Sequence, residues 1–229
     1  MSAPVYQSST ERVKVWLDQD DCTLQIQFNN PERHNALSVD MWEAVTPLLS
    51  VAETDERIRL VIFSGAGDKA FVSGADITQF EDMRAAKEAV ARYELMAEQA
   101  LMGIYNFSKP TLARIRGYCI GGGVNVAMSC DIRIAADDSV FSIPAARLGL
   151  GYRYSALKNL VDLVGPAVAK DLFFTARRIT AEEAREVGLI TRVCEVSRLD
   201  ALELEYKQAL AANAPITVCA GKAIIREIL

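Results

Sequence analysis

Residues 71–77 read Phe-Val-Ser-Gly-Ala-Asp-Ile, and residues 117–125 read Gly-Tyr-Cys-Ile-Gly-Gly-Gly-Val-Asn. Both segments place small residues where backbone N–H groups can face a ligand, and neither contains an obvious side-chain catalyst. Three successive glycines let a ligand or another part of the chain approach the backbone closely. Two amides that converge on one carbonyl oxygen stabilise negative charge there, each lowering a barrier by roughly 3–4 kcal/mol. The two segments therefore predict an oxyanion hole.

The pair of segments resembles the enoyl-CoA hydratase/isomerase (crotonase) superfamily, whose members hold an acyl-CoA thioester carbonyl between two backbone N–H groups. The resemblance runs from about Val13 to Val196. Further motifs follow in the family's order: Asn30-Pro31-Glu32-Arg33-His34-Asn35-Ala36-Leu37, Lys109-Pro110-Thr111, Cys130-Asp131, Pro144 and Leu148-Gly149. Carried over by position, the two donors are the amides of Ala75 and Gly122.

This resemblance implies an α/β fold, a crotonase-like spiral of β-β-α units with a helical C-terminal region. It also implies an acyl-CoA substrate, with coenzyme A as part of that substrate and no other required cofactor. Relatives assemble as homotrimers or dimers of trimers, so we expect the same here. The superfamily uses one oxyanion hole for many reactions, and the resemblance is weaker evidence for the reaction.

The positions that hold two glutamates in the family's hydratases are occupied here by Asn125 and Ala145. Those glutamates activate and deliver water, and each such acid–base group contributes roughly 10²–10⁴ in rate. A further slot, which holds aspartate in dienoyl-CoA isomerases, falls on or near Arg153. The chain is thus expected to be an atypical member that hydrates simple enoyl-CoA esters poorly.

Tyr152 offers a different chemistry. The stretch Leu148-Gly149-Leu150-Gly151-Tyr152 resembles the methylmalonyl-CoA decarboxylase branch, in which a tyrosine occupies the matching place. Decarboxylation suits a site without a base, because loss of CO₂ itself generates the enolate; Arg147 or Arg153 would then face the substrate carboxylate. That branch has a histidine where this chain has Ala75, and Tyr152 can equally be a packing residue at a loop corner.

The resemblance assigns the coenzyme A thioester to a set of loop residues: Arg33, His34, Ala36, Ser73, Ala75, Asp76 and Ile77. Asp76 is expected to orient the loop that presents the Ala75 amide, and not to act as a general base. For Arg33 and His34 the alternative is a solvated loop. His34 is the only histidine in the chain, which excludes multi-histidine metal sites, and no metal is expected.

Composition bounds the remaining possibilities. The 229 residues are 51% hydrophobic and 24% charged, which is typical of a globular protein with a substantial core. A net charge of −5 argues against nucleic-acid binding, which needs clustered positive charge. No apolar run is long enough for a membrane span and no signal peptide is evident, so we expect a cytoplasmic protein. The five scattered cysteines predict no disulfide framework, and Cys119 is expected to be buried and inert.

Local patterns predict the elements. Residues 12–18 and 22–28 alternate apolar and polar side chains and read as an antiparallel hairpin. Helices are expected at 39–53, 83–107 and 121–129, and strands at 58–63, 111–115, 132–135 and 189–193. Thr180 begins a capping box, with Gly188 at the end of that helix. Residues 65–69 read as a turn, because they lack the spacing of a phosphate-binding loop.

Two regions are expected along the chain. Residues 1–196 form the spiral core, and residues 197–229 form a helical C-terminal region with helices over 199–212 and from Pro215 onward. By comparison with the family this second region is expected to be incomplete. Three functions remain open: an enoyl-CoA hydratase/isomerase-type lyase or isomerase of fatty-acid or related acyl-CoA metabolism, a malonyl-type acyl-CoA decarboxylase, and a non-catalytic acyl-CoA binding protein.

Overall fold

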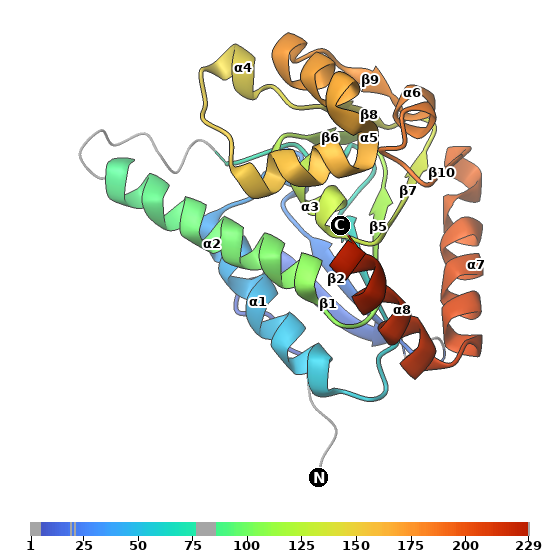
Figure 1. Cartoon of the computed structure of the whole chain (residues 1–229). Coiled ribbons are helices and arrows are strands. Elements are labelled where there is room, and N and C mark those ends of the chain that lie inside the picture. The colour runs from blue at the N-terminus through green and yellow to red at the C-terminus, as the bar shows by residue number, and fades with distance from the viewer. Residues whose placement is uncertain (1–5, 19, 21, 77–85, 229) are drawn as a thin grey trace.

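The computed structural model describes residues 6–18, 20, 22–76 and 86–228 (Figure 1). Within this part of the chain the strands form two sheets. The six-stranded sheet has the order β1-β2-β3-β5-β7-β10: Val13–Asp18, Thr23–Phe28, Leu60–Gly65, Thr111–Ile115, Ile132–Ala136 and Arg192–Cys194. The four-stranded sheet has the order β4-β6-β8-β9: Ala70–Val72, Tyr118–Ile120, Val140–Ser142 and Ile179–Thr180.

Helices follow the strands along the chain. The α-helices are α1 Val39–Thr54, α2 Ala86–Asn106, α3 Gly122–Ser129, α4 Ala145–Leu148, α5 Tyr154–Thr175, α6 Ala181–Glu186, α7 Leu199–Ala212 and α8 Pro215–Ile228. Short 3₁₀ turns occupy Pro31–Arg33 and Val196–Arg198. The described helices include none that is long and apolar enough to cross a membrane.

The arrangement is a spiral of β-β-α units. In each of three successive pairs, β3–β4, β5–β6 and β7–β8, the first strand joins the large sheet and the second joins the small one. After β4 and after β6 a helix leads back to the large sheet, where β3, β5 and β7 pair in parallel. After β8 the chain passes through α4, α5, β9 and α6 before β10 joins the large sheet. The predicted spiral is therefore confirmed.

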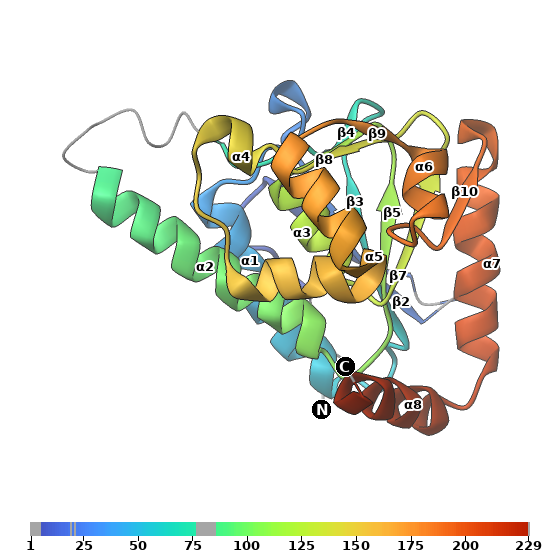
Figure 2. The same ribbon diagram turned by 45° about the horizontal axis from the view of Figure 1, so that its top comes forward.

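Alternate side chains of β3 face two different hydrophobic cores. Val61 and Phe63 face the main core, which they share with α1 and the fully buried Trp42. Leu60 and Ile62 face the opposite side, where α7 covers the large sheet with Leu199 and Leu202. Successive side chains of a strand point to opposite faces, so one buried strand supplies both layers. In Figure 2, α7 stands alone on its side of the sheet, while α1, α2, α3 and α5 lie on the other.

Several local predictions are confirmed. β1 and β2 pair antiparallel, with Val13 opposite Phe28 and Asp18 opposite Thr23. Thr180 caps α6, because its side-chain oxygen accepts a hydrogen bond from the Glu183 N–H. Within the predicted turn at 65–69, Gly65 ends β3 and residues 66–69 connect it to β4, with Gly67 at a positive φ. Ser38 is the residue before α1, and its hydroxyl donates to Asp40 instead of accepting a bond from a helix N–H.

Two local predictions were wrong or incomplete. The strand expected at 189–193 is observed as Arg192–Cys194, because Leu189 and Ile190 are buried in the preceding loop, where the Leu189 carbonyl accepts a bond from Arg133. The helices α4 and α5 were not predicted. Gly165 has a φ of 75° inside α5, which divides the helix into two segments and obscures a single helical pattern.

The two C-terminal helices, α7 and α8, differ in how they pack against the rest of the protein. The boundary predicted at residue 196 lies between β10 and α7, and α7 packs its buried leucines on the large sheet. α8 begins at Pro215, as predicted, yet it contains no fully buried residue. It lies beside the C-terminal end of α2, at one extremity of the molecule (Figures 1 and 2).

Candidate active site

The Ala75 amide is positioned by a short bridge between two loops. Leu37 pairs in parallel with Ala75: the Leu37 N–H donates to the Gly74 carbonyl at 2.8 Å, and the Asp76 N–H donates to the Leu37 carbonyl at 2.9 Å. In such a bridge the bonds use the neighbours of the central residue, so the N–H of Ala75 points away from Leu37. No described residue accepts a hydrogen bond from it.

The Gly122 amide comes from the first turn of α3. A helix leaves its first N–H groups without partners in the helix, and the aligned peptide dipoles make that end attractive to negative charge. Among the described residues the Gly122 N–H has no acceptor. A Cβ on Gly122 would lie 3.7 Å from the Gly74 carbonyl carbon, so α3 begins in contact with the loop that carries Ala75.

Two glycines explain why the segments meet so closely. Gly74 has a φ of 120°, a conformation that L side chains rarely adopt. A Cβ on Gly123 would lie 2.3 Å from the Val72 carbonyl oxygen, which only glycine avoids. Gly123 thus packs α3 against β4, and Gly122 beside it contacts the Gly74 backbone. We call Gly74, Ala75, Gly122 and Gly123 the oxyanion corner.

Asp76 closes the loop behind the oxyanion corner. Its side chain is 7% exposed, and its Oδ1 lies 3.6 Å from Nη1 of Arg33. Its backbone N–H is held by Leu37. The orienting role of this carboxylate stays a prediction. Its contact with Arg33, 43 residues earlier in the sequence, was not predicted.

Asn125 and Tyr152 meet at the other side of the opening. Asn125 lies three residues beyond Gly122 on α3, about 5 Å along the helix axis. The Tyr152 hydroxyl donates to Asn125 Oδ1 at 2.5 Å, and its ring packs edge-on against Phe173 with centroids 5.3 Å apart. Burial raises the pKa of Tyr152 well above its usual range, so the hydroxyl holds its proton at neutral pH. Tyr152 therefore both packs against Phe173 and holds the Asn125 side chain.

No carboxylate takes the places of Asn125 and Ala145. Ala145 is buried at the start of α4 and presents only a methyl group. The carboxylate found in this neighbourhood is Glu98 of α2, which sequence reasoning missed. Glu98 is already bound: Arg153 Nη1 lies 2.7 Å from it and the Ser155 hydroxyl donates to it at 3.0 Å.

Arg153 and Arg147 are less available than the sequence suggested. Arg153 contacts Glu94 at 3.8 Å in addition to Glu98. Arg147 is exposed and donates to the Ala176 carbonyl at 3.2 Å. A substrate carboxylate would compete with Glu98 for Arg153, whereas Arg147 carries no carboxylate partner among the described residues.

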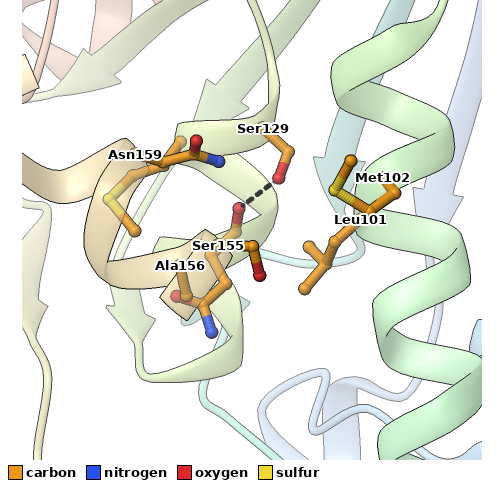
Figure 3. A pocket seen from close by; sticks show the side chains of 8 residues that line it. Leu101, Met102, Ser129, Ser155, Ala156 and Asn159 are labelled. Carbon is orange, nitrogen blue, oxygen red and sulfur yellow. Dashed lines mark hydrogen bonds between the residues drawn. The ribbon is translucent and has the colours of Figure 1, made fainter. Parts of the chain in front are cut away.

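A small cavity lies on the inner side of Asn125, between α2, α3 and α5 (Figure 3). Its volume is about 10 Å³, close to the minimum for one water molecule. Ser129, Ser155 and Asn159 face it from the polar side, and Leu101 and Met102 close it from α2. The Ser129 hydroxyl donates to the Asn125 carbonyl at 2.9 Å. The side chains between α2, α3 and α5 are therefore closely packed, with room for at most about one water molecule.

Only part of the set predicted to hold coenzyme A is exposed. Arg33, His34 and Ala75 are exposed and form a rim, whereas Ala36 and Asp76 are buried. Ser73 ties the two loops together: its hydroxyl donates to the Arg33 carbonyl and its N–H to the His34 carbonyl. Ile77 lies outside the described residues.

Tyr118 is a rim residue that sequence reasoning missed. Its ring centroid lies 6.0 Å from that of His34, and the Arg178 guanidinium lies 5.8 Å from the Tyr118 ring. Tyr118 is 38% exposed in the structure. No sequence pattern indicates its position, because only the fold brings these three residues together.

Among the described residues, neither Cys119 nor the acidic side chains form a nucleophilic or metal site. Cys119 is fully buried behind the oxyanion corner, and burial raises the pKa of its thiol well above the ordinary value, as expected for an inert residue. Within the described ranges no group of His, Cys, Asp and Glu side chains could hold a metal ion.

Comparison with known proteins gives consistent results. The family model described as enoyl-CoA hydratase/isomerase matches residues 18–228. The chain is 33% identical over 213 residues to the short-chain-enoyl-CoA hydratase of Clostridium acetobutylicum, covering 93% of this chain and 81% of the relative. It is 31% identical to the peroxisomal Delta(3,5)-Delta(2,4)-dienoyl-CoA isomerase of Arabidopsis thaliana, covering 90% of this chain and 78% of that one.

Solved structures share the architecture. A putative enoyl-CoA hydratase/isomerase family protein from Hyphomonas neptunium superposes with a TM-score of 0.90 at 36% identity, covering 97% of this chain and 84% of that chain. An enoyl-CoA hydratase/carnithine racemase from Magnetospirillum magneticum gives the same TM-score at 32% identity, covering 96% and 82%. The predicted crotonase fold is confirmed.

Proposed function

The chain belongs to the enoyl-CoA hydratase/isomerase family of acyl-CoA enzymes, and we propose that it forms a thioester enolate held by the Ala75 and Gly122 amides, which Tyr152 then protonates. The supporting observation is the site's set of donors: two amides that have no acceptor among the described residues, and the Tyr152 hydroxyl bound to Asn125 on α3. Groups of this kind stabilise negative charge and deliver a proton. They do not remove one.

The reaction that this combination supports best is decarboxylation of a malonyl-type acyl-CoA. The bond between the α-carbon and the carboxylate breaks, CO₂ leaves, and the electron pair passes into the thioester enolate on the oxyanion corner. The Tyr152 hydroxyl gives its proton to the α-carbon and recovers one from water. No base is needed, in agreement with Asn125 and Ala145 at the two positions where the family's hydratases carry glutamate.

Hydration of a short enoyl-CoA is the second candidate, and the names of the relatives favour it. The relative from Clostridium acetobutylicum is a short-chain-enoyl-CoA hydratase. Hydration requires a group that activates water, and Glu98 is the carboxylate bound to Ser155, which lines the same small cavity as Asn125, and to Arg153. If hydration is the reaction, Glu98→Gln will lower it strongly, while Tyr152→Phe will leave it nearly unchanged.

The experiment offers malonyl-, methylmalonyl- and ethylmalonyl-CoA to the protein and follows CO₂ release, with crotonyl-CoA hydration measured in parallel. We expect CO₂ release from one of the three esters and only slow hydration. Robust hydration without CO₂ release would replace the first candidate with the second. Tight acyl-CoA binding without turnover across the panel would identify a non-catalytic binding protein.

The coenzyme A portion is proposed to lie across the rim of Arg33, His34 and Ala75. A homotrimer or dimer of trimers is also part of the proposal, because α8 exposes Ile216, Ile224 and Ile228 on its outer surface. Light scattering coupled to size-exclusion chromatography tests this assembly; a monomer at micromolar concentration would contradict it.

A further inference from the structure

A second hollow lies far from the oxyanion corner, under α8. Its volume is about 430 Å³, within the range of about 300–1,000 Å³ typical of ligand pockets. α8 forms one wall, the end of α2 another, and the C-terminal end of α3 the floor. The lining is mostly apolar: Tyr105, Met128, Leu163, Leu210, Val218 and Ile225. We call this cavity the α8 hollow.

α8 has no buried side chain, and polar contacts hold it over this hollow. The Lys222 ammonium donates to Asp131 at 2.7 Å and to the Lys109 carbonyl at 2.9 Å. Arg226 donates to the Asn106 carbonyl at the end of α2. Because apolar packing does not close α8 on the body, the space beneath it stays open to a ligand.

Arg133 is the most unusual lining residue of the α8 hollow. Its side chain is almost completely buried, and its Nε and Nη1 donate to the carbonyls of Leu189 and Cys130 at 2.9 and 2.6 Å. Its Nη2 has no acceptor among the described residues, and none of their carboxylates forms an ion pair with it. A buried cation without an anion is costly, so a bound carboxylate would be favoured here.

The other charges around the hollow compensate this positive charge only in part. The Asp131 carboxylate acts on Arg133 but also binds Lys222, and Asp162 is bound by Lys158 at 2.6 Å. Arg226, like Arg133, forms no ion pair in the described part of the chain. The apolar walls therefore carry two guanidinium groups without an ion-pair partner of their own.

We propose that the α8 hollow binds an amphipathic monocarboxylate, an unbranched acyl chain with a free carboxylate attracted to Arg133 and Arg226. The flexible Met128 adapts to the tail, and the remaining apolar walls enclose it. A planar guanidinium pairs well with a carboxylate, which selects this head group over a cationic or neutral one. The hollow meets α3 at its C-terminal end, through Met128 and Ser129, whereas Gly122 of the oxyanion corner begins the same helix.

Gly221 supplies a test of the location. It lines the hollow on α8, and a Cβ built on it meets no heavy atom within 4 Å, so added side chains extend into open space. Gly221→Phe fills the cavity, and Gly221→Ala is the matched control. Decanoate, below its micellar concentration, is titrated calorimetrically into the wild type and each variant. Decyltrimethylammonium tests the head group and acetate the tail.

We expect one saturable decanoate site in the wild type and in Gly221→Ala. Gly221→Phe removes it, and Arg226→Met weakens it about tenfold, while Lys222 still anchors α8 to Asp131. The proposal is overturned by absence of saturable binding, by equal binding of decyltrimethylammonium, or by decanoate binding that Gly221→Phe and Arg226→Met do not change. A further outcome overturns the proposal: decanoate does not bind the wild type, and Gly221→Phe dissociates an oligomer. In that case a second copy of the chain fills the hollow.

Discussion

The oxyanion corner and the α8 hollow each present hydrogen-bond donors without acceptors, but they are built in opposite ways. At the oxyanion corner a helix start and a loop meet so closely that a Cβ on Gly123 would lie 2.3 Å from a carbonyl oxygen. At the α8 hollow a helix without buried side chains leaves open space around Gly221. Backbone groups held by tight packing suit a developing charge, whereas side chains around a cavity suit a stable ligand.

The largest effect is expected from removing one backbone donor. Proline is well tolerated at the first position of a helix, so Gly122→Pro deletes the N–H and retains α3. Gly122→Ala keeps the N–H, and its Cβ makes only ordinary contacts of 3.7–3.8 Å. We expect kcat to fall about 10²–10³-fold in the proline variant and far less in the alanine variant. Equal losses in both would indicate a steric effect instead.

Removal of the Tyr152 hydroxyl should have the next largest effect. Tyr152→Phe keeps the ring against Phe173 and loses the bond to Asn125. With the substrate found to turn over, kcat should fall about 10²-fold with little change in KM, because the hydroxyl acts in proton transfer and not in binding. A variant with unchanged kcat would return Tyr152 to a packing role.

The same glycine-to-alanine change should have opposite signs in the two regions. Gly123→Ala forces β4 and α3 apart, and we expect it to lower the free energy of unfolding by about 2 kcal/mol. Gly221→Ala meets open space in a helix and should raise it by about 0.5–1 kcal/mol. Urea denaturation measures both. A loss of stability in Gly221→Ala would show that α8 is packed more tightly than described.

A smaller effect concerns the stability of the folded protein in alkali. Burial raises the pKa of Tyr152, so the neutral hydroxyl is favoured in the folded state. The resulting stability is fully present below about pH 10, the ordinary value for tyrosine, and is lost as pH rises toward the folded-state pKa. Between pH 10 and 11 the wild type should lose up to about 1.4 kcal/mol more than Tyr152→Phe. Parallel pH profiles of unfolding would contradict this.

The sequence predicted those features that depend on local pattern. The β1–β2 hairpin, the Thr180 cap, α7 and the start of α8 at Pro215 follow from periodicity, capping and proline geometry. The shift of the last strand to Arg192 does not, because burial of Leu189 and Ile190 in the preceding loop is a tertiary effect.

The site was predictable where the backbone provides it and unpredictable where side chains meet across the chain. The family resemblance assigned the Ala75 and Gly122 amides by position, and the structure brings Gly122 into contact with the Gly74 backbone. Four contacts had no local signal: Arg33 with Asp76, Tyr152 with Asn125, Arg153 with Glu98, and Arg178 with Tyr118. Each joins elements that only the spiral brings into register.

The most direct test of the central claim measures the thioester carbonyl itself. A saturated acyl-CoA labelled with ¹³C at the carbonyl is bound to the wild type and to Gly122→Pro, and its stretching frequency is recorded by difference infrared spectroscopy. Two converging amides predict a frequency below that of the free ester in the wild type, and a return toward the free value in the variant. A bound ester with an unshifted carbonyl in the wild type would contradict the oxyanion hole at Ala75 and Gly122.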